Sequence, residues 1–243
     1  MATDHALARR LGEGEAVLRF YQWEVPTLSF GRNQRARGAY REEDIRGAGM
    51  DLVRRPTGGR AVLHHQELTY AVVLPLRTLG GLRDVYRKVN EGLVLGLTRL
   101  GVPAAVSGAT GTALPPEAGA CFQAPAEGEV VVGGRKLVGS AQARVEGALL
   151  QHGSLLLAGD QRRAEVLDGS GANQAQETSG AYVTLSEVLA EPPELSSLIR
   201  ELAQGVGEVL GGEWRRAEPT SEEETVAEEL RKRYESPDWT WRR

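Results

Sequence analysis

Cysteine and lysine are scarce in this chain, and long apolar runs are missing. Cysteine occurs once, at Cys121, which excludes an internal disulfide. No stretch of 18 or more apolar residues is present, so we expect no membrane-spanning helix. The N-terminal residues lack the apolar core of a signal peptide, and we therefore expect a cytoplasmic protein.

Basic residues are not in excess either. The chain has 29 Lys and Arg against 33 Asp and Glu, a formal net charge of −4. Proteins that bind nucleic acids usually carry a strongly basic face, so we expect no nucleic-acid partner. The 4 histidines and the single cysteine form no cluster with metal-ligand spacing, so we expect no metal site.

The length and composition fit one large domain with a small appendage. Of 243 residues, 41% are apolar, which allows a core that needs no disulfide or metal for stability. We expect a catalytic domain over residues 1–212 and a C-terminal helical tail over 213–243, packed on the same domain.

Hydrophobic periodicity predicts the elements of secondary structure. Helices are expected near 3–11, 82–100, 184–190, 194–210 and 221–236. Strands are expected within 17–30, 61–65, 68–76, 129–133, 135–138 and 148–157. Residues 106–120 are rich in Gly, Ala and Pro and predict a mobile loop that ends at Cys121. Helices and strands do not alternate strictly, which favours an α+β fold with a mixed, largely antiparallel sheet flanked by helices.

The glycine-rich stretch RRPTGG could bind a polar ligand. Gly58 and Gly59 would let a carbonyl, carboxylate or phosphate approach backbone N–H groups, and Arg54 and Arg55 would add forked donors. A tight turn with solvated arginines is an equally good interpretation of the composition.

Two further side chains could take part in catalysis. Lys136 lies in an apolar strand, where alternation sends it to the face opposite Leu137. A partly buried lysine can polarise a carbonyl or take a proton, although a solvent-facing strand lysine is more common. Cys121 could attack a thioester as a thiolate, although a lone cysteine is more often a small buried apolar residue. His64 and His152 are expected to line a pocket or hold loops by hydrogen bonds.

Three motifs in order, RRPTGGRAVLHHQELTYAVV, GRKLVGSAQAR and GALLQHGSLLL, resemble the biotin/lipoate protein ligase superfamily. Within it, Cys121-Phe122-Gln123 followed by GRKLVGSAQ resembles the cysteine-dependent octanoyltransferases of the LipM type. The resemblance covers nearly the whole chain.

This resemblance implies a reaction in which Cys121 takes an octanoyl group from acyl carrier protein as a thioester. A lysine of a lipoyl domain of a 2-oxoacid dehydrogenase, or of the glycine-cleavage H protein, would then accept it. No cofactor is implied. Lys136 would be the second catalytic residue, binding the acyl carbonyl. An apolar slot would hold the eight-carbon chain. The substrate-binding set would be Arg54, Arg55, Gly58, Gly59, His64, Gly139, Ser140, Ala141, His152 and Gly153.

Some positions depart from the family's pattern. His65 stands where relatives often have Asp, and Glu67 stands where ligases commonly have Asn. Relatives usually have roughly one more strand upstream of the first helix, so we expect either that the start lies too far downstream or that the native N-terminus is shortened.

Three alternatives stay open at this stage. An ATP-dependent lipoate ligase would use Mg-ATP and would not need Cys121. An amidotransferase would take octanoate from another lipoyl-bearing protein, and an idle binding module would form no acyl intermediate. Because carrier proteins are acidic, exposed arginines are expected to steer docking at the pocket mouth, from among Arg54, Arg55, Arg60 and Arg83.

Overall fold

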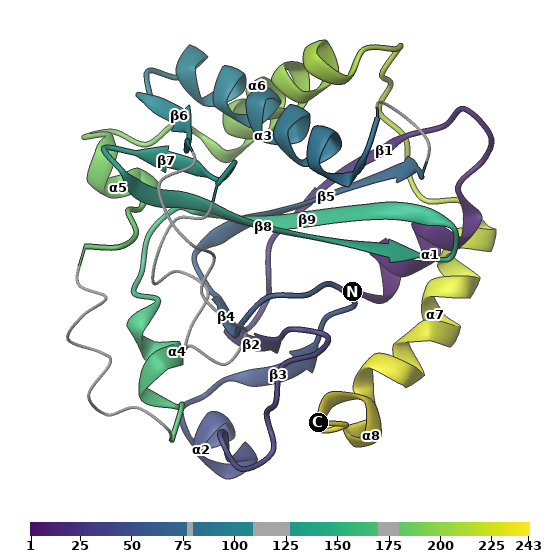
Figure 1. Cartoon of the computed structure of the whole chain (residues 1–243), viewed down its shortest axis with the longest axis vertical. Coiled ribbons are helices and arrows are strands. Elements are labelled where there is room, and N and C mark those ends of the chain that lie inside the picture. Colours follow the sequence, from purple (N-terminus) through teal and green to yellow (C-terminus); the bar gives the residue numbers. More distant parts are fainter. Residues whose placement is uncertain (77–79, 109–126, 170–179) are drawn as a thin grey trace.

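A six-stranded antiparallel sheet forms the centre of the fold (Figure 1). The computed structural model describes residues 1–76, 80–108, 127–169 and 180–243. In sheet order the strands are β1 (Val17–Tyr21), β5 (Glu67–Pro75), β9 (Ala148–Leu156), β8 (Arg135–Val145), β7 (Val130–Val132) and β6 (Ala104–Val106). Cys121 and most of the loop predicted over 106–120 lie outside the described residues.

A second, three-stranded sheet lies beside the first. Its order is β3 (Asp51–Arg54), β2 (Thr27–Phe30), β4 (Val62–His64). The β2–β3 pair is parallel and β2–β4 is antiparallel, with the short helix α2 (Glu42–Gly47) connecting β2 to β3. The sheets are therefore mixed and largely antiparallel, which confirms the expected α+β fold class.

Two long helices cover one face of the large sheet, at the top of Figure 1: α3 (Leu82–Arg99) and α6 (Leu195–Leu210). The predicted apolar stripe of α3 packs into the main core with alternate residues of β5, among them Tyr70 and Val72. Ala71 and Val73 point to the opposite face and pack with Leu7 of the first helix. Because β5 is buried on both faces, its sequence is a nearly continuous apolar run rather than an alternating one.

The opposite side is formed by the N-terminal and C-terminal helices. Helix α1 (Ala2–Arg10) packs against α7 (Ser221–Glu235), and α8 (Pro237–Thr240) follows directly. The ring nitrogens of His5 bond Tyr234 of α7 and Glu146 of the β8–β9 turn, each at 3.0 Å. The C-terminal segment is thus tied to both the first helix and the central sheet.

Glycines with positive φ end helix α3 and turn the β7–β8 hairpin. Gly101, after α3, has φ +80°, and Gly133-Gly134 in the β7–β8 hairpin have φ +57° and +78°. These left-handed conformations favour glycine, which explains why turns form at these points. Elements that the sequence did not predict are short: α2, β3, β6, α8 and the five-residue helix α4 (Arg162–Val166). Within the described ranges, no helix is both long and apolar enough to cross a membrane.

The α3–α6 crossing gives a stability prediction. A Cβ at Gly205 would lie 2.3 Å from the carbonyl oxygen of Gly92, and one at Gly92 would lie 2.5 Å from Cα of Val206. Since backbone atoms cannot rotate away, Gly205→Ala should lower the free energy of unfolding by about 1–3 kcal/mol. Gly47→Ala is the control, because its Cβ would meet nothing within 4 Å. A Gly205→Ala variant with wild-type stability in urea denaturation would contradict this packing.

Candidate active site

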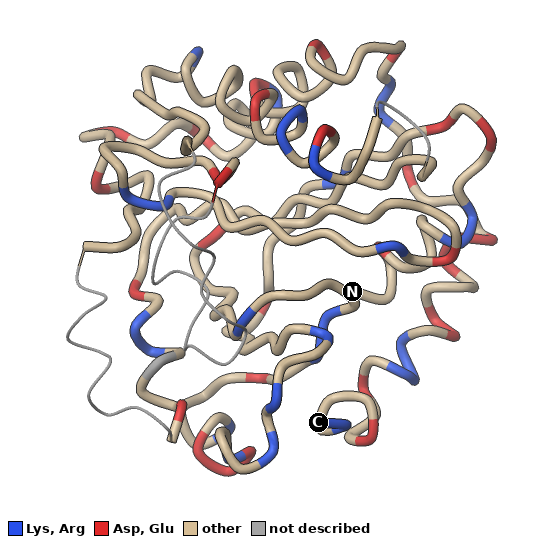
Figure 2. Tube along the Cα trace, in the orientation of Figure 1, with Lys and Arg blue, Asp and Glu red and all other residues tan. Residues whose placement is uncertain are grey.

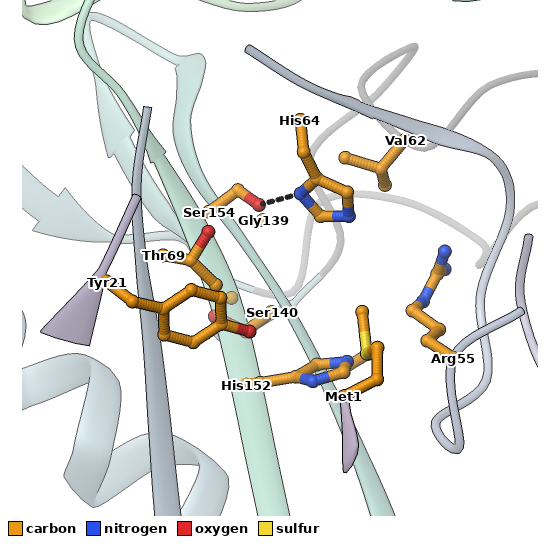
Figure 3. Close-up of a pocket in the computed structure, with 12 residues that line it drawn as sticks. Met1, Tyr21, Arg55, Val62, His64, Thr69, Gly139, Ser140, His152 and Ser154 are labelled. Atoms are coloured by element: carbon orange, nitrogen blue, oxygen red, sulfur yellow. Dashed lines mark hydrogen bonds between the residues drawn. The ribbon is translucent and has the colours of Figure 1, made fainter. Parts of the chain in front are cut away.

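A pocket lies between the two sheets, and it contains most of the residues that the sequence predicted for substrate binding (Figure 3). Seven predicted residues line it: Arg55, His64, Gly139, Ser140, Ala141, His152 and Gly153. The other lining residues are Met1, Tyr21, Val62, Thr69 and Ser154. The volume of this pocket is about 30 Å³, room for one or two water molecules. An acyl chain could therefore enter this pocket only if side chains moved.

The predicted exposure of Arg54 and Arg55 is wrong, because both side chains are buried. Arg54 is 0% exposed, and its guanidinium donates to the carbonyl oxygens of Thr240, Gly31 and Gln34 at 2.5–2.8 Å. Burial, followed by repulsion from neighbouring arginines, lowers the pKa of Arg54 to about 10. Arg54 thus joins the C-terminal segment to the loop after β2 and cannot steer a partner at the surface.

Arg55 is 3% exposed and holds the RRPTGG turn together. Its guanidinium donates to the carbonyl oxygens of Gly58, Arg60 and Ser29, and to the hydroxyl of Ser29. Gly58 and Gly59 do not line the pocket among the described residues, but a Cβ on the facing Gly31 would collide with the Gly59 carbonyl at 1.8 Å. The turn is therefore packed tightly against the β2 loop.

His64 stands at the centre of a buried hydrogen-bond network. Its Nδ1 lies 2.7 Å from the Glu67 carboxylate, and its Nε2 lies 2.8 Å from the Ser29 hydroxyl. The same Glu67 oxygen also accepts from the hydroxyls of Thr69, at 2.6 Å, and Ser154, at 2.9 Å. Because a carboxylate only accepts, this network assigns the His64 proton to Nδ1 and leaves Nε2 as the acceptor for Ser29. His64 is thus held in one tautomer in the pocket wall.

Trp23 packs against one face of the His64 ring. The two rings stack with centroids 4.4 Å apart and an interplanar angle of 13°, and the Trp23 Nε1–H donates to Thr69 Oγ1 at 2.9 Å. His64 thus lines the pocket and is held by hydrogen bonds, while its part in substrate binding stays a prediction. Glu67, the carboxylate partner of His64, is buried, with 2% of its surface exposed.

His152 also lines the pocket as predicted. Its Nε2 lies 2.5 Å from the Thr57 hydroxyl, whereas its buried Nδ1 has no hydrogen-bond partner among the described residues. Burial lowers the pKa of His152 to about 3. The Asp4 carboxylate opposes this shift, and the positive charge of Arg55 adds to it. The ring is therefore neutral in the folded protein.

This pKa predicts a loss of stability in acid. An unfolded histidine titrates at about 6.5, so below that pH the unfolded chain binds a proton that folded His152 does not. Between pH 7 and 5, His152 should lower the free energy of unfolding by about 2 kcal/mol. His152→Gln should remove this component, which urea denaturation of both proteins at the two pH values can measure. Equal pH dependence in variant and wild type would show that His152 titrates normally.

On the other face of the large sheet, polar side chains meet below α3. The Tyr70 hydroxyl lies 2.6 Å from Ser140 Oγ and accepts from Gln151 Nε2 at 2.9 Å. Asn90 Oδ1 accepts from Ser140 Oγ and Gln151 Nε2, each at 3.3 Å. Burial raises the pKa of Tyr70 to about 12, so its hydroxyl stays protonated. The Ser140 hydroxyl is thus hydrogen-bonded to Tyr70 and Asn90 below α3. These hydrogen bonds hold in place the β8 segment that lines the pocket.

Lys136 forms a buried ion pair. Its side chain is 1% exposed, and its Nζ lies 2.7 Å from Oε1 of Glu129, which is 5% exposed. The common alternative for a strand lysine, a solvent-facing position, is therefore excluded. Lys136 lies on β8 three residues before Gly139, the first β8 residue of the pocket wall, and is not itself among the lining residues. Such a pair is costly to break, since either partner alone would be a buried uncompensated charge.

Several residues of these networks were missed at the sequence level. Glu129 stands immediately before the apolar strand β7, and Glu67 is the first residue of the apolar strand β5. A carboxylate at such a position is a usable signal, since it needs a buried partner. Glu129 lies two residues before Val131, the residue paired with Lys136 across the hairpin. Ser29, Asn90 and Gln151 gave no comparable signal. Among the described residues, no group of three or more His, Cys, Asp or Glu side chains could hold a metal ion.

Comparison with known proteins gives relatives over the full length of the chain. Octanoyltransferase LipM of Kyrpidia tusciae is 38% identical over 258 residues, covering 100% of this chain and 94% of the relative. Octanoyltransferase LipM of Moorella thermoacetica is 38% identical over 255 residues, covering 100% and 93%.

Solved structures share the fold. The crystal structure of a lipoate-protein ligase A bound with ATP has a TM-score of 0.81 at 24% identity, covering 99% of this chain and 92% of that one. A putative lipoate protein ligase from T. acidophilum with bound lipoic acid has a TM-score of 0.80 at 24% identity, covering 100% and 92%. The family model described as the lipoyl protein ligase A/B catalytic domain matches residues 1–206. The chain therefore belongs to the lipoyl protein ligase A/B catalytic domain family, as its three motifs predicted.

Proposed function

We propose that this chain is an octanoyltransferase that moves octanoyl from acyl carrier protein, through a thioester on Cys121, to a lysine of a lipoyl domain or glycine-cleavage H protein. The proposal rests on one observation: this chain is similar over its whole length to proteins named octanoyltransferase LipM. The buried Lys136–Glu129 pair supports it, because it keeps an ammonium group in a water-poor site.

The reaction would proceed in two balanced steps. The Cys121 thiolate attacks the carbonyl carbon of the octanoyl thioester, and the pantetheine thiolate leaves and takes up a proton. The neutral amine of the acceptor lysine then attacks the Cys121 thioester, the amide forms, and the cysteine thiolate is released while the amine loses a proton. Splitting the reaction in this way is covalent catalysis.

Lys136 would stabilise charge in both steps. Its ammonium group can donate to the acyl carbonyl oxygen, where negative charge develops in the transition state, and can hold the Cys121 thiolate by Coulomb attraction. Glu129 would set the direction of the Lys136 Nζ in the resting enzyme. Backbone N–H groups near Gly139 and Ser140, and at the Gly58-Gly59 turn, would supply further donors to the oxyanion.

No cofactor is needed for this proposal, because a thioester is already activated for acyl transfer. One position also disfavours adenylate chemistry: Glu67 stands where ligases commonly have Asn. The Glu67 carboxylate is committed to His64, Thr69 and Ser154. Glu67 therefore has a structural role in the pocket wall.

The test is a transfer assay with purified proteins. Octanoyl-carrier protein and a lipoyl domain should give an octanoylated domain without ATP, seen by mass spectrometry, and octanoyl-H protein as donor should be much less effective. Free octanoate or lipoate with Mg-ATP should give no product. ATP-dependent use of free lipoate that survives Cys121→Ala would instead establish a ligase, and preference for octanoyl-H protein would establish an amidotransferase.

A further inference from the structure

Four arginines gather where the C-terminal segment meets the loop after β2: Arg32, Arg233, Arg242 and Arg243. The guanidinium carbons of Arg233 and Arg242 lie 3.9 Å and 4.2 Å from the ring centroid of Trp239. Arg242 also donates to the carbonyl oxygen of Arg32, while a terminal carboxyl oxygen of Arg243 accepts from the backbone N–H of Ala36 and Arg37 at 3.0 Å. We call these four residues the Trp239 arginine cluster; Figure 2 shows basic positions on the last turns of α7 and at the C-terminus.

The arginine side chains of this cluster differ from other surface arginines in their partners. Arg99 pairs with Glu208 at 2.7 Å and Arg135 with Glu187 at 3.0 Å, whereas no member of the cluster forms an ion pair with a carboxylate within the part of the chain that is described. Burial lowers the pKa of Arg242, and repulsion from Arg32, Arg243 and Arg233 lowers it further. Several positive charges are therefore held together at a cost, which an anionic partner would relieve.

The cluster is joined directly to the pocket. The Arg32 N–H donates to the carbonyl oxygen of Thr57 at 2.7 Å, and the Thr57 hydroxyl lies 2.5 Å from His152 in the pocket wall. Arg32 itself is exposed. One backbone hydrogen bond and one side-chain hydrogen bond thus separate the positive surface from the candidate active site.

We propose that the Trp239 arginine cluster is the docking surface for the acidic face of the donor carrier protein, an inference that rests on the proposed function. The chemistry of the two substrates favours the donor. A carrier protein presents its thioester on an arm that contains a negatively charged phosphodiester, whereas the acceptor presents a lysine ammonium. The positive charge of the Trp239 arginine cluster attracts the phosphodiester of the donor and repels the lysine ammonium of the acceptor.

The experiment measures binding and transfer separately on the full chain. Arg32→Glu, Arg233→Glu and the double variant are compared with Arg200→Glu, an equal charge change on α6 across the molecule, where Arg200 pairs with Glu201. Binding of the carrier protein is titrated at low and high salt. Transfer is measured with octanoyl-carrier protein and with octanoyl-pantetheine, which has neither phosphate nor protein. The thermal midpoint of each variant checks folding, and Arg233→Lys checks whether charge alone suffices.

The double variant should raise the dissociation constant and the KM for octanoyl-carrier protein about tenfold and weaken their salt dependence. The kcat, the KM for the lipoyl domain and the rate with octanoyl-pantetheine should stay within about twofold of wild type, and Arg233→Lys should behave nearly as wild type. An unchanged dissociation constant, a change confined to the lipoyl-domain KM, or equal loss with both donors would overturn the docking proposal. A wild-type protein that binds the carrier through these arginines yet transfers no octanoyl would keep the docking surface and overturn the proposed function alone.

Discussion

Replacing Lys136 with methionine should slow octanoyl transfer about 10²–10⁴-fold, the range expected when a proton-donating group that touches the reacting atoms is lost. The same change should destabilise the fold by about 3–5 kcal/mol, because Glu129 would be left as a buried unpaired charge. Steady-state kinetics and urea denaturation measure the two effects on one preparation.

A second variant separates the chemical effect from the structural one. In Lys136→Met combined with Glu129→Gln, no buried charge lacks its partner, so most of the lost stability should return while activity should not. Glu129→Gln alone should shift the pH profile of kcat, since the ammonium then loses the carboxylate that lies 2.7 Å from it. If the double variant regained both stability and activity, Lys136 would be a structural residue and its catalytic role would be disproved.

Cys121→Ser should abolish turnover with octanoyl-carrier protein. A serine hydroxyl is hardly ionised at neutral pH, and the thiolate is the nucleophile that the first step requires. The expected loss is on the order of 10³-fold or more in kcat, and binding of the carrier protein should be unchanged. Cys121 follows a segment rich in Gly, Ala and Pro, so the thermal midpoint should hardly move.

Cys121→Ala serves as the control for residual nucleophilicity at this position. Both variants should be equally inactive. Turnover by Cys121→Ala at a rate near wild type, with the same donor and without ATP, would mean that the acyl group passes directly from carrier to acceptor lysine.

The long elements could be predicted because local pattern and tertiary structure agree. The α3 stripe from Val85 to Leu97 is buried as its spacing indicates, and the glycines at 101, 133 and 134 adopt the conformations that end a helix or turn a hairpin. Strand β3 was missed. It has only four residues, begins with the exposed Asp51, and owes its place to a parallel partner, β2.

The site was predictable in its residue types and less so in their surroundings. Arg54 and Arg55 stand beside a glycine-rich turn, which suggested exposed donors for a ligand. Arg54 instead bonds carbonyl groups of segments distant in sequence, Gly31 and Thr240, and Arg55 bonds the distant Ser29 as well as Gly58 and Arg60 of its own turn. Sequence spacing cannot show such approaches, because they depend on how two sheets and the C-terminal segment pack together. The family and the fold are confirmed, and acyl transfer is supported by full-length relatives; the roles of Cys121 and Lys136 stay predictions.

The most direct measurement is the intact mass of the protein after incubation with octanoyl-carrier protein, in the absence of both ATP and acceptor. One octanoyl group should appear on the wild-type chain, vanish on treatment with hydroxylamine, and never form on Cys121→Ser. An unmodified chain that still octanoylates a lipoyl domain would contradict a cysteine thioester as the centre of this chemistry.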